Sequence, residues 1–440
     1  MASRISRRKL IQVAGAGAFA LGSGLAVPRR ARAAKKTLKI LQWNHFVPGY
    51  DKWFNNVYTK QWGEKNDTEV IVDNVGIPAL NTSSAAEVAA KKGHDLFQFL
   101  SPKAVYEEDV IDHGPIYEEC EKRGYGKPIS LAVKSTYNPK TKKYFGFSDS
   151  FAPDPINYRK DLWDDIGMKP DTWDNLRIGG AKLKAKGHPV GNSLGHSNDP
   201  STTWRGLLWC YGASEQDESG KKIVLNSKEA VEATKYVAAL YKEAMTSDVL
   251  SWNDASNNQY IDSGVASYIV NPISAYRTAQ KLNPKLADDI FVMEPPKGPA
   301  KQIMGAASEF YGIWKFAQNK EAALEFLKYY VENWPEAFKA SEGYNNPCFA
   351  NLVPKPMPIL SNDPTSNPHD KLAILQDSDK WSAIPGYPGP ATPAMDEIYY
   401  AFIFNDMMTK TATDQLSAED SVKWATEQCE IIMKKWAGKA

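Results

Sequence analysis

Residues 291–331, FVMEPPKGPAKQIMGAASEFYGIWKFAQNKEAALEFLKYYV, decide the fold of this chain. The first three are apolar and stop at two prolines, which predicts a buried strand followed by a turn. Gly305 opens a run of small residues, and the apolar and aromatic residues 311–316 predict a second strand. A strand, a turn, a second strand and then a helix follow one another without a long gap.

The helix of this stretch is predicted to begin after Asn319, whose side chain is expected to accept a hydrogen bond from a first-turn N–H group. Glu321 then lies near the positive end of the helix dipole. Pro335 is expected to end the helix at Trp334. Apolar residues recur at helical spacing and predict one buried face: Ala323, Phe326, Leu327, Tyr330, Val331 and Trp334.

This order of parts resembles the family 1 extracellular solute-binding proteins, the sugar receptors of ABC importers. In that family a strand with Pro-Pro-x-Gly leads to a glycine-containing strand, a polar turn and a helix ending near F-L-K-Y. Residues 157–173, NYRKDLWDDIGMKPDTW, are similar to a second signature, Y-N-K-x-L-F followed by Gly and P-x-T-W. Residues 263–266 lie where the family has F-x-x-G-x-A. The resemblance covers residues 37–436.

The resemblance implies an α/β fold, a two-lobed periplasmic binding protein of type II-like architecture with a hinge of several crossover segments. Strands alternating with helices over residues 37–100 also predict a mainly parallel sheet, which is expected in each lobe. Lobe 1 is expected to comprise residues 35–150 and 291–340. Lobe 2 is expected to comprise residues 151–290 and 341–440, with the C-terminal helices. Ligands of such sheets bind at the carboxyl ends of strands, which places residues 42–46 and 97–101 near the site.

The first 34 residues have the pattern of a cleavable export signal. Arg7 and Arg8 form a twin-arginine pattern, an apolar run too short to span a bilayer follows, and residues 31–33 match an A-x-A cleavage site. A general-secretion signal is the alternative. This segment holds seven cations and no acids, so cleavage leaves 46 basic and 52 acidic residues and a net charge of −6. Such a charge favours no binding to nucleic acid or anionic lipid. No cysteine directly follows this segment to carry a lipid anchor, so the mature protein is expected to be free in the periplasm, without a membrane-spanning segment. It is also expected to be a monomer.

The four cysteines form no C-x-x-C motif, so neither a zinc site nor a redox motif is predicted. In an exported protein they allow one or two disulfides, whose pairing the sequence leaves open. No cofactor and no metal are expected, although the acidic loop 362–370 leaves a metal role open without EF-hand spacing.

A sugar site needs aromatic faces against C–H patches and planar polar groups for hydroxyls. The chain has 13 Trp and 21 Tyr, many of them beside polar residues. Packing in a core is the alternative role for each aromatic residue. The candidate ligand-binding residues are Asn44, His45, Phe46, Trp204, Trp252, Asn253, Asn271, Tyr276, Glu309, Phe310 and Tyr344.

The predicted function is to bind a neutral sugar or polyol between the lobes and deliver it to the ABC permease in the inner membrane, with no reaction. A non-sugar ligand of the same fold, such as a peptide, an amine or an organic acid, is the first alternative. A hydrolase is the second, because residues 191–195, GNSLG, match G-x-S-x-G with Ser193 as nucleophile. That motif requires a strand, a sharp turn and a helix, and residues 196–200 are predicted to open no helix.

Overall fold

The structure is a computed structural model, and it describes residues 36–438. The expected signal peptide, residues 1–34, lies outside the described residues. Within residues 36–438 no helix is long and apolar enough to cross a membrane.

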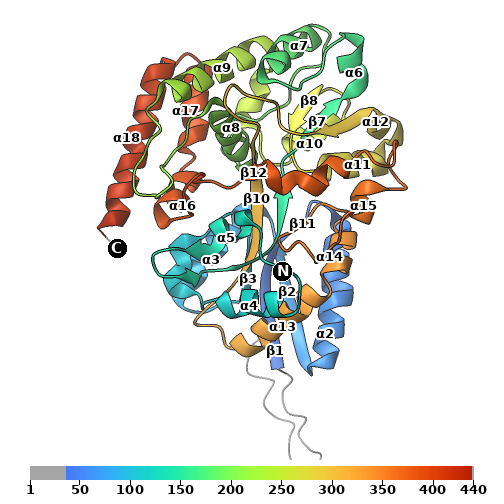
Figure 1. Ribbon diagram of the computed structural model, residues 1–440, viewed down its shortest axis with the longest axis vertical. Coiled ribbons are helices and arrows are strands. Elements are labelled where there is room, and N and C mark those ends of the chain that lie inside the picture. The colour runs from blue at the N-terminus through green and yellow to red at the C-terminus, as the bar shows by residue number, and fades with distance from the viewer. Residues whose placement is uncertain (1–35, 439–440) are drawn as a thin grey trace, which may run out of the picture. The chain divides into compact units, whose positions relative to one another are not determined.

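The larger sheet forms the centre of lobe 1 (Figure 1). Its strand order is β11-β6-β10-β3-β1-β2, with β12 paired to β10. β1 is parallel to β2 and β3, as the alternating pattern predicts, and β10 is antiparallel to β3 and β6. The strands are β1 (Lys36–Trp43), β2 (Thr68–Val75), β3 (Leu96–Phe99), β6 (Phe147–Pro153), β10 (Met304–Ile313), β11 (Asn346–Pro347) and β12 (Ser382–Ala383).

An aromatic cluster attaches α13 (Lys320–Glu332) to the helical segment after β1. That segment comprises α1 (Pro48–Trp53), a π-helical turn (Phe54–Tyr58) and α2 (Thr59–Lys65). Phe326 lies edge-on to Tyr58, at 4.9 Å between ring centroids, and Tyr58 donates its hydroxyl to the carbonyl of Phe326 at 2.7 Å. The predicted apolar face of α13 is therefore the face that packs.

Two details at the ends of α13 differ from expectation. Asn319 occupies the N-cap position but makes no side-chain cap, because its amide donates to the carbonyl of Thr37 in β1 at 2.5 Å. Pro335 lies in the first turn of a new helix, α14 (Trp334–Ala340), where proline lacks only an N–H that has no helical partner. The helix before it ends at Glu332.

The smaller sheet belongs to lobe 2 and has the order β8-β7-β9. β7 (Ile156–Arg159) is antiparallel to both β8 (Tyr268–Val270) and β9 (Ile290–Met293), so the expected parallel sheet in this lobe is wrong. The local pattern of each strand is right, but pairing is a tertiary property. Because β9 pairs here, the chain returns to the larger sheet with β10 and not at residue 291.

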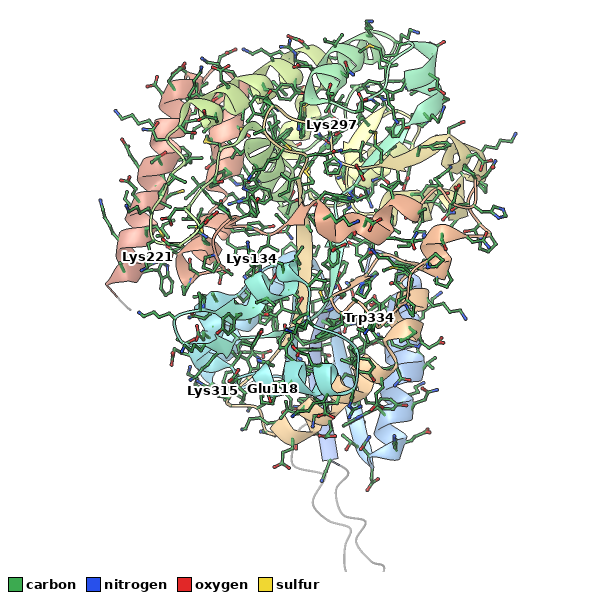
Figure 2. The ribbon with its side chains drawn as sticks, viewed as in Figure 1. Glu118, Lys134, Lys221, Lys297, Lys315 and Trp334 are labelled. Carbon is green, nitrogen blue, oxygen red and sulfur yellow. The ribbon has the colours of Figure 1, made fainter. Side chains whose placement is uncertain are left out.

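Helices cover both sheets, and side chains fill the space between them (Figure 2). The helices of lobe 1 are α3 (Ile77–Ala90), α4 (Gly114–Lys122) and α5 (Ser130–Thr136). Lobe 2 and the C-terminal part contain α6 (Lys160–Asp165), α7 (Trp173–Ala185), α8 (Asn198–Tyr211), α9 (Lys228–Ala244), α10 (Ser256–Asp262), α11 (Ser274–Leu282), α12 (Pro284–Asp289), α15 (Pro358–Ser361), α16 (Pro393–Tyr400), α17 (Ile403–Ala412) and α18 (Ala418–Ala437). A two-residue hairpin, β4 (Tyr137–Asn138) with β5 (Lys143–Tyr144), completes the strands described.

Two crossings between the lobes are visible in the strands. β6 of the larger sheet leads directly into β7 of the smaller one. β10 begins against α8, where a Cβ on Gly305 would lie 2.6 Å from Cβ of Thr202, and ends in the larger sheet. The absence of a side chain at Gly305 therefore lets α8 approach the strand that joins the lobes.

Candidate ligand-binding site

Three aspartates meet where the two lobes join. Asp154 follows β6, Asp199 lies in the first turn of α8, and Asp254 precedes α10. The backbone N–H of Asp199 donates to Oδ1 of Asp254 at 3.0 Å. Asn257 donates through Nδ2 to Oδ2 of Asp199 at 2.8 Å and also to Oδ1 of Asn271 at 3.3 Å. The positions of two of the carboxylates are thus set by hydrogen bonds from lobe 2.

The three carboxylates have no cationic partner within residues 36–438, where no ion pair involves any of them. Burial raises the pKa of Asp154 to about 7, and the charge of Asp254 adds to this. Burial also raises the pKa of Asp199, with further contributions from Asp254 and Asp154. Burial and the neighbouring carboxylates therefore favour the protonated, neutral forms of Asp154 and Asp199.

Three tyrosines lie within electrostatic range of one or more of the three carboxylates, hereafter the aspartate cluster (Asp154, Asp199 and Asp254). Tyr344 is 4% exposed, and its hydroxyl makes no hydrogen bond to any residue that the structure describes. Burial raises the pKa of Tyr344, followed by the charges of Glu309 and of all three aspartates. Tyr399 and Tyr400 lie on α16, and burial followed by other charges, among them Asp254, raises the pKa of both.

Residues of lobe 1 reach the same place. The hydroxyl of Tyr400 contacts Ser101, which follows β3 at the carboxyl end of the strand. Tyr399 donates to Oδ1 of Asn198 at 3.3 Å, in the first turn of α8. α16 thus connects the end of a lobe 1 strand with the start of a lobe 2 helix. The site combines carboxylates, amides and phenol rings from both lobes.

A second polar network lies inside lobe 1, next to the larger sheet. The N–H of Val47 donates to Nδ1 of His45 at 2.9 Å, so Nε2 carries the proton and donates to Oδ1 of Asn345 at 2.9 Å. Asn345 in turn donates through Nδ2 to Oε2 of Glu309 at 3.1 Å. Burial lowers the pKa of His45 to about 4, which keeps the ring neutral.

Glu309 and Asp149 form a pair of fully enclosed acids on β10 and β6. Ser150 donates to Oδ2 of Asp149 at 2.9 Å and to Oε2 of Glu309 at 3.4 Å, and Trp334 donates to Oδ2 of Asp149 at 3.3 Å. The other oxygen of each acid, Oδ1 of Asp149 and Oε1 of Glu309, has no hydrogen-bond partner among the residues that the structure describes. Burial raises the pKa of Asp149 to about 6, and burial followed by the charge of Asp149 raises that of Glu309 well above its usual value.

The lobe 1 candidates predicted from the sequence fall into two groups. His45 and Glu309 belong to the buried network, and Tyr344 packs on the His45 ring at 4.8 Å between centroids. Asn44 is exposed and Phe46 is half-buried at the end of β1. Phe310 is fully buried against Phe99, at 5.0 Å between ring centroids, inside the larger sheet.

The lobe 2 candidates are spread over several elements. Trp204 is fully buried and donates to the carbonyl of Ser193 at 3.0 Å. Trp252 packs edge-on against Tyr260, and Asn253 is exposed and accepts from the N–H of Ala255 at 2.9 Å. Tyr276 is buried and donates to Ser366 at 2.9 Å. Of this group, Asn271 is linked to the aspartate cluster indirectly: Nδ2 of Asn257 donates both to Oδ1 of Asn271 and to Oδ2 of Asp199. Roles in ligand binding stay predictions for all of them.

Sequence reasoning missed the aspartate cluster itself. Asp154 lies in the proline- and aspartate-rich stretch 148–155, Asp199 in the polar run 197–203, and Asp254 directly after Trp252 and Asn253. All three stretches look like polar connections, in which an aspartate is expected to be solvated. The available signal was that each of these three polar stretches contains an acid.

Ser193 lacks the surroundings of a hydrolase nucleophile. The helix α8 begins at Asn198, so the expectation that no helix opens there is wrong, but four residues separate it from the serine. Ser193 is buried, and its hydroxyl accepts from the N–H of Gly195 at 3.1 Å. The nearby His196 is exposed and pairs with Asp406. Within residues 36–438 no histidine hydrogen-bonds to Ser193.

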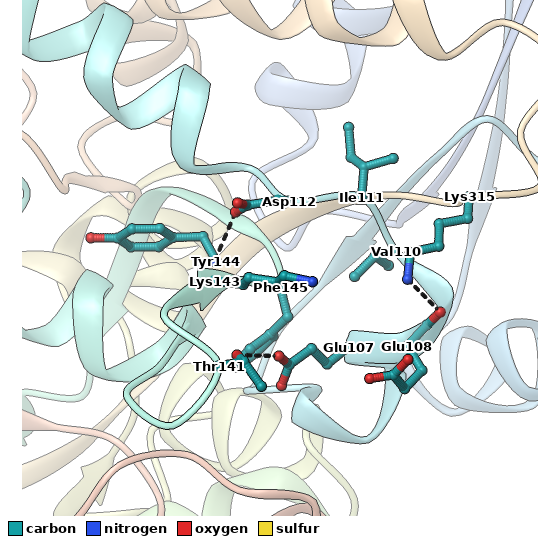
Figure 3. Close-up of a pocket in the computed structure, with 10 residues that line it drawn as sticks. All are labelled: Glu107, Glu108, Val110, Ile111, Asp112, Thr141, Lys143, Tyr144, Phe145 and Lys315. Atoms are coloured by element: carbon teal, nitrogen blue, oxygen red, sulfur yellow. Dashed lines mark hydrogen bonds between the residues drawn. The ribbon is translucent and has the colours of Figure 1, made fainter.

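Other candidate sites carry less chemistry. All four cysteines are buried free thiols, so the disulfides that the sequence allows are not formed. In the loop 362–370 Asp363 pairs with Arg277, and within the described residues no three His, Cys, Asp or Glu side chains are grouped to hold a metal ion. A cavity of about 50 Å³ lies in lobe 1. Figure 3 shows the residues that line it, among them Glu107 hydrogen-bonded to Thr141, and Lys315, which donates to the carbonyl of Glu108 at 2.8 Å.

Solved structures with the same fold come from several bacteria. A sugar transporter of Arthrobacter chlorophenolicus with bound laminaribiose matches with a TM-score of 0.76 at 16% identity, over 90% of this chain and 98% of the other. Maltose-bound MalE3 of T. maritima matches with 0.75 at 17%, over 90% and 99%. A solute-binding protein of an ABC transporter from Agrobacterium radiobacter, in complex with ribitol, matches with 0.73 at 16%, over 90% and 98%.

These likenesses establish the two-lobed periplasmic binding protein fold. No curated protein matches the chain. The sequence model of the bacterial extracellular solute-binding proteins matches residues 48–333, which include β2, β3, β6 to β10 and the three aspartates of the cluster. Because that match spans well over half of the chain, the protein belongs to the bacterial extracellular solute-binding protein family.

Proposed function

We propose that this protein is the receptor of an ABC importer and binds a carbohydrate or polyol at the aspartate cluster. The observation that carries the proposal is the meeting of three carboxylates and three tyrosines from both lobes at one place. Carboxylates accept hydrogen bonds from hydroxyls, and phenol rings cover the C–H faces of a sugar ring. The related structures named above contain laminaribiose, maltose and ribitol, which supports this ligand class.

Binding rather than catalysis is the role that this site supports. Its groups come from two lobes joined by strands, so a ligand between them gains contacts with both lobes only when they close. The closed form is then the form that the membrane permease recognises. The twin-arginine segment exports the chain, and the mature protein acts outside the cytoplasm as a monomer.

Isothermal titration calorimetry of the protein without residues 1–34 tests the proposal with monosaccharides, disaccharides, oligosaccharides and polyols. We expect saturable 1:1 binding of at least one of them and a smaller radius of gyration by X-ray scattering with that ligand. Asp254→Asn is expected to weaken binding at least tenfold, because its carboxylate is part of the cluster. Asp379→Asn, on an exposed side chain, is the matched control and is expected to leave binding unchanged.

The enzyme alternative has its own test. Ser193→Ala is expected to leave carbohydrate affinity unchanged within twofold, because Ser193 is buried against Trp204, which donates to its carbonyl, and is not part of the aspartate cluster. Turnover of an ester or glycoside substrate that disappears in this variant would contradict the proposed function. A panel in which no sugar or polyol binds, with the folded protein verified by circular dichroism, would reject it as well.

A further inference from the structure

The segment from β12 to α16, hereafter the bridging segment (residues 382–400), contacts both lobes. β12 pairs in parallel with the first residues of β10, next to α8 of lobe 2. Figure 1 shows α16 below the C-terminal helices α17 and α18 and above α3 of lobe 1. The bridging segment is therefore placed to affect how the two lobes move relative to each other.

Hydrogen bonds to its backbone attach the bridging segment to lobe 2. The N–H of Gly386 donates to Oε1 of Glu215, and its carbonyl accepts from Nε2 of Gln216 at 2.7 Å. The same amide donates to the carbonyl of Pro390 at 2.9 Å. Glu215 and Gln216 are buried just after α8. Because these partners all belong to lobe 2, the bridging segment moves with that lobe.

The contacts of α16 with lobe 1 come from residues that follow β3. Oδ2 of Asp396 accepts from the N–H of Val105 at 2.9 Å. The ammonium group of Lys103 lies 3.3 Å from the centroid of the Tyr400 ring, and the hydroxyl of Tyr400 contacts Ser101. Lys103 and Asp396 are each 6% exposed. Burial raises the pKa of Asp396 and lowers that of Lys103, while the charge of each opposes the shift of the other.

A second contact with lobe 1 lies just before α16. Lys134, on α5, donates through Nζ to the carbonyl of Pro388 at 3.1 Å. The carbonyl of Lys134 accepts from the N–H of Ala391 at 3.3 Å. Lobe 1 is therefore bonded to the bridging segment at two places along the chain.

The two surfaces meet closely. A cavity of about 10 Å³ remains between them, with Ser101 and Pro102 of lobe 1 on one side and Met395 and Asp396 of α16 on the other. A volume of that size holds about one water molecule and is far too small for a sugar. The protein's own side chains therefore make this contact between the lobes, without a ligand.

Movement about the crossover strands separates these two sets of contacts. When lobe 2 turns away from lobe 1, the hydrogen bonds of the bridging segment to lobe 2 are kept, and those to lobe 1 break. Opening then exposes Lys103, Asp396 and the N–H of Val105 to water. The contacts with lobe 1 are thus made only in the closed form, and they favour it.

From these contacts we propose that the bridging segment is a latch, in which α16 binds Ser101, Lys103 and Val105 and holds the two lobes closed in the absence of a ligand. This inference rests on the lobe closure of the proposed function and adds a contribution of the chain itself to the closed form. A ligand then shifts an equilibrium that the latch already biases towards closure.

Pulsed electron paramagnetic resonance on the ligand-free protein without residues 1–34 tests the latch. Spin labels on Lys92→Cys in lobe 1 and Lys228→Cys in lobe 2 report the distance between the lobes. Both positions are exposed, whereas the four native thiols are buried and are not labelled in the folded protein. We expect the shorter distance of the closed form to be the main population of the labelled parent.

Asp396→Ala in this labelled protein is expected to lower the ratio of closed to open molecules at least tenfold. The change leaves the N–H of Val105 without its acceptor and the buried ammonium group of Lys103 without its nearby opposite charge. Both groups are hydrated in the open form, so the loss falls on the closed form. Lys103→Met tests the same contact from lobe 1 and is expected to shift the ratio in the same direction.

Glu397→Ala is the matched control on the same helix. It also removes a carboxylate, but this carboxylate accepts from Lys435 and Trp436 of α18, each at 2.7 Å. Those partners lie in the same lobe as α16, so the ratio is expected to change less than threefold. Circular dichroism verifies the fold of every variant, and Lys103→Met takes the place of Asp396→Ala if the latter does not fold.

Several results would overturn the latch. These are a ligand-free parent that is mainly open, equal ratios in the parent and the two latch variants, or a shift in Glu397→Ala as large as that in Asp396→Ala. Each leaves the carbohydrate receptor standing, because calorimetry with sugars and polyols tests that function separately. Failure of all those sugars and polyols to bind would reject the proposed function, while the ligand-free ratios would still decide whether the latch exists.

Discussion

The enclosed acid pair of lobe 1 leads to a prediction about stability and pH. Asp149 is 1% exposed, and burial raises its pKa from 3.8 to about 6. The folded protein therefore binds this proton more tightly than the unfolded chain does. A pKa that moves from 3.8 to about 6 corresponds to about 3 kcal/mol.

The sign follows from which state loses its proton first. Below pH 3.8 both states are protonated and Asp149 contributes fully. As the pH rises through 3.8 the unfolded chain ionises and the contribution to stability declines, until the folded state ionises above about pH 6. Asp149→Asn removes this titration. The variant should therefore gain about 3 kcal/mol relative to the parent between pH 4 and pH 7.5.

Urea unfolding followed by tryptophan fluorescence measures this difference at several pH values. The quantity to plot is the free energy of unfolding of the variant minus that of the parent, since other titrating groups cancel in it. Asp379→Asn, at an exposed position, should give a nearly flat line. Glu309→Gln should slope in the same direction as Asp149→Asn, because burial raises the pKa of Glu309 too. A flat line for Asp149→Asn would refute the reasoning that the folded protein holds this proton.

Three further outcomes are expected. Glu215→Gln should lower the free energy of unfolding by about 3 to 5 kcal/mol in urea titrations, because it leaves the buried guanidinium of Arg205 without its counter-charge. The same kind of change in an ion pair at the exposed surface should cause no such loss. His113, whose pKa burial lowers to about 4, should keep a neutral ring in nuclear magnetic resonance spectra from pH 7 down to pH 5, and a midpoint near 6.5 would contradict this. Gly305→Ala should lower the melting temperature, since the new Cβ would meet the backbone of α8 at 2.8 Å and overpacking costs about 1 to 3 kcal/mol. Gly76→Ala, where the nearest atom lies 3.9 Å away, is its control, and equal effects of both changes would count against the close contact.

Local patterns in the sequence located many of the secondary-structure elements. The strand expected at residues 291–293 is β9 (Ile290–Met293), and the helix expected after Asn319 is α13 (Lys320–Glu332). The reason is that hydrophobic periodicity and turn residues act over a few positions, which the chain carries with it wherever it folds. The motif order over residues 157–331 was likewise enough to indicate the family.

What the sequence alone determined about this protein is therefore its elements, its two-lobed class and its family. Only the tertiary structure decided that β9 pairs antiparallel with β7, and that Asp154, Asp199 and Asp254 share one place. Each of these arrangements joins residues that are far apart in the sequence, and a pattern of a few neighbouring residues does not show which distant residues will lie close together in space. The same holds for Glu309: its apolar strand indicated burial, but its neighbour Asp149 belongs to another strand. The pKa of Glu309 rises only in the folded protein, because burial and the nearby charge of Asp149 act on it only after β6 and β10 have paired.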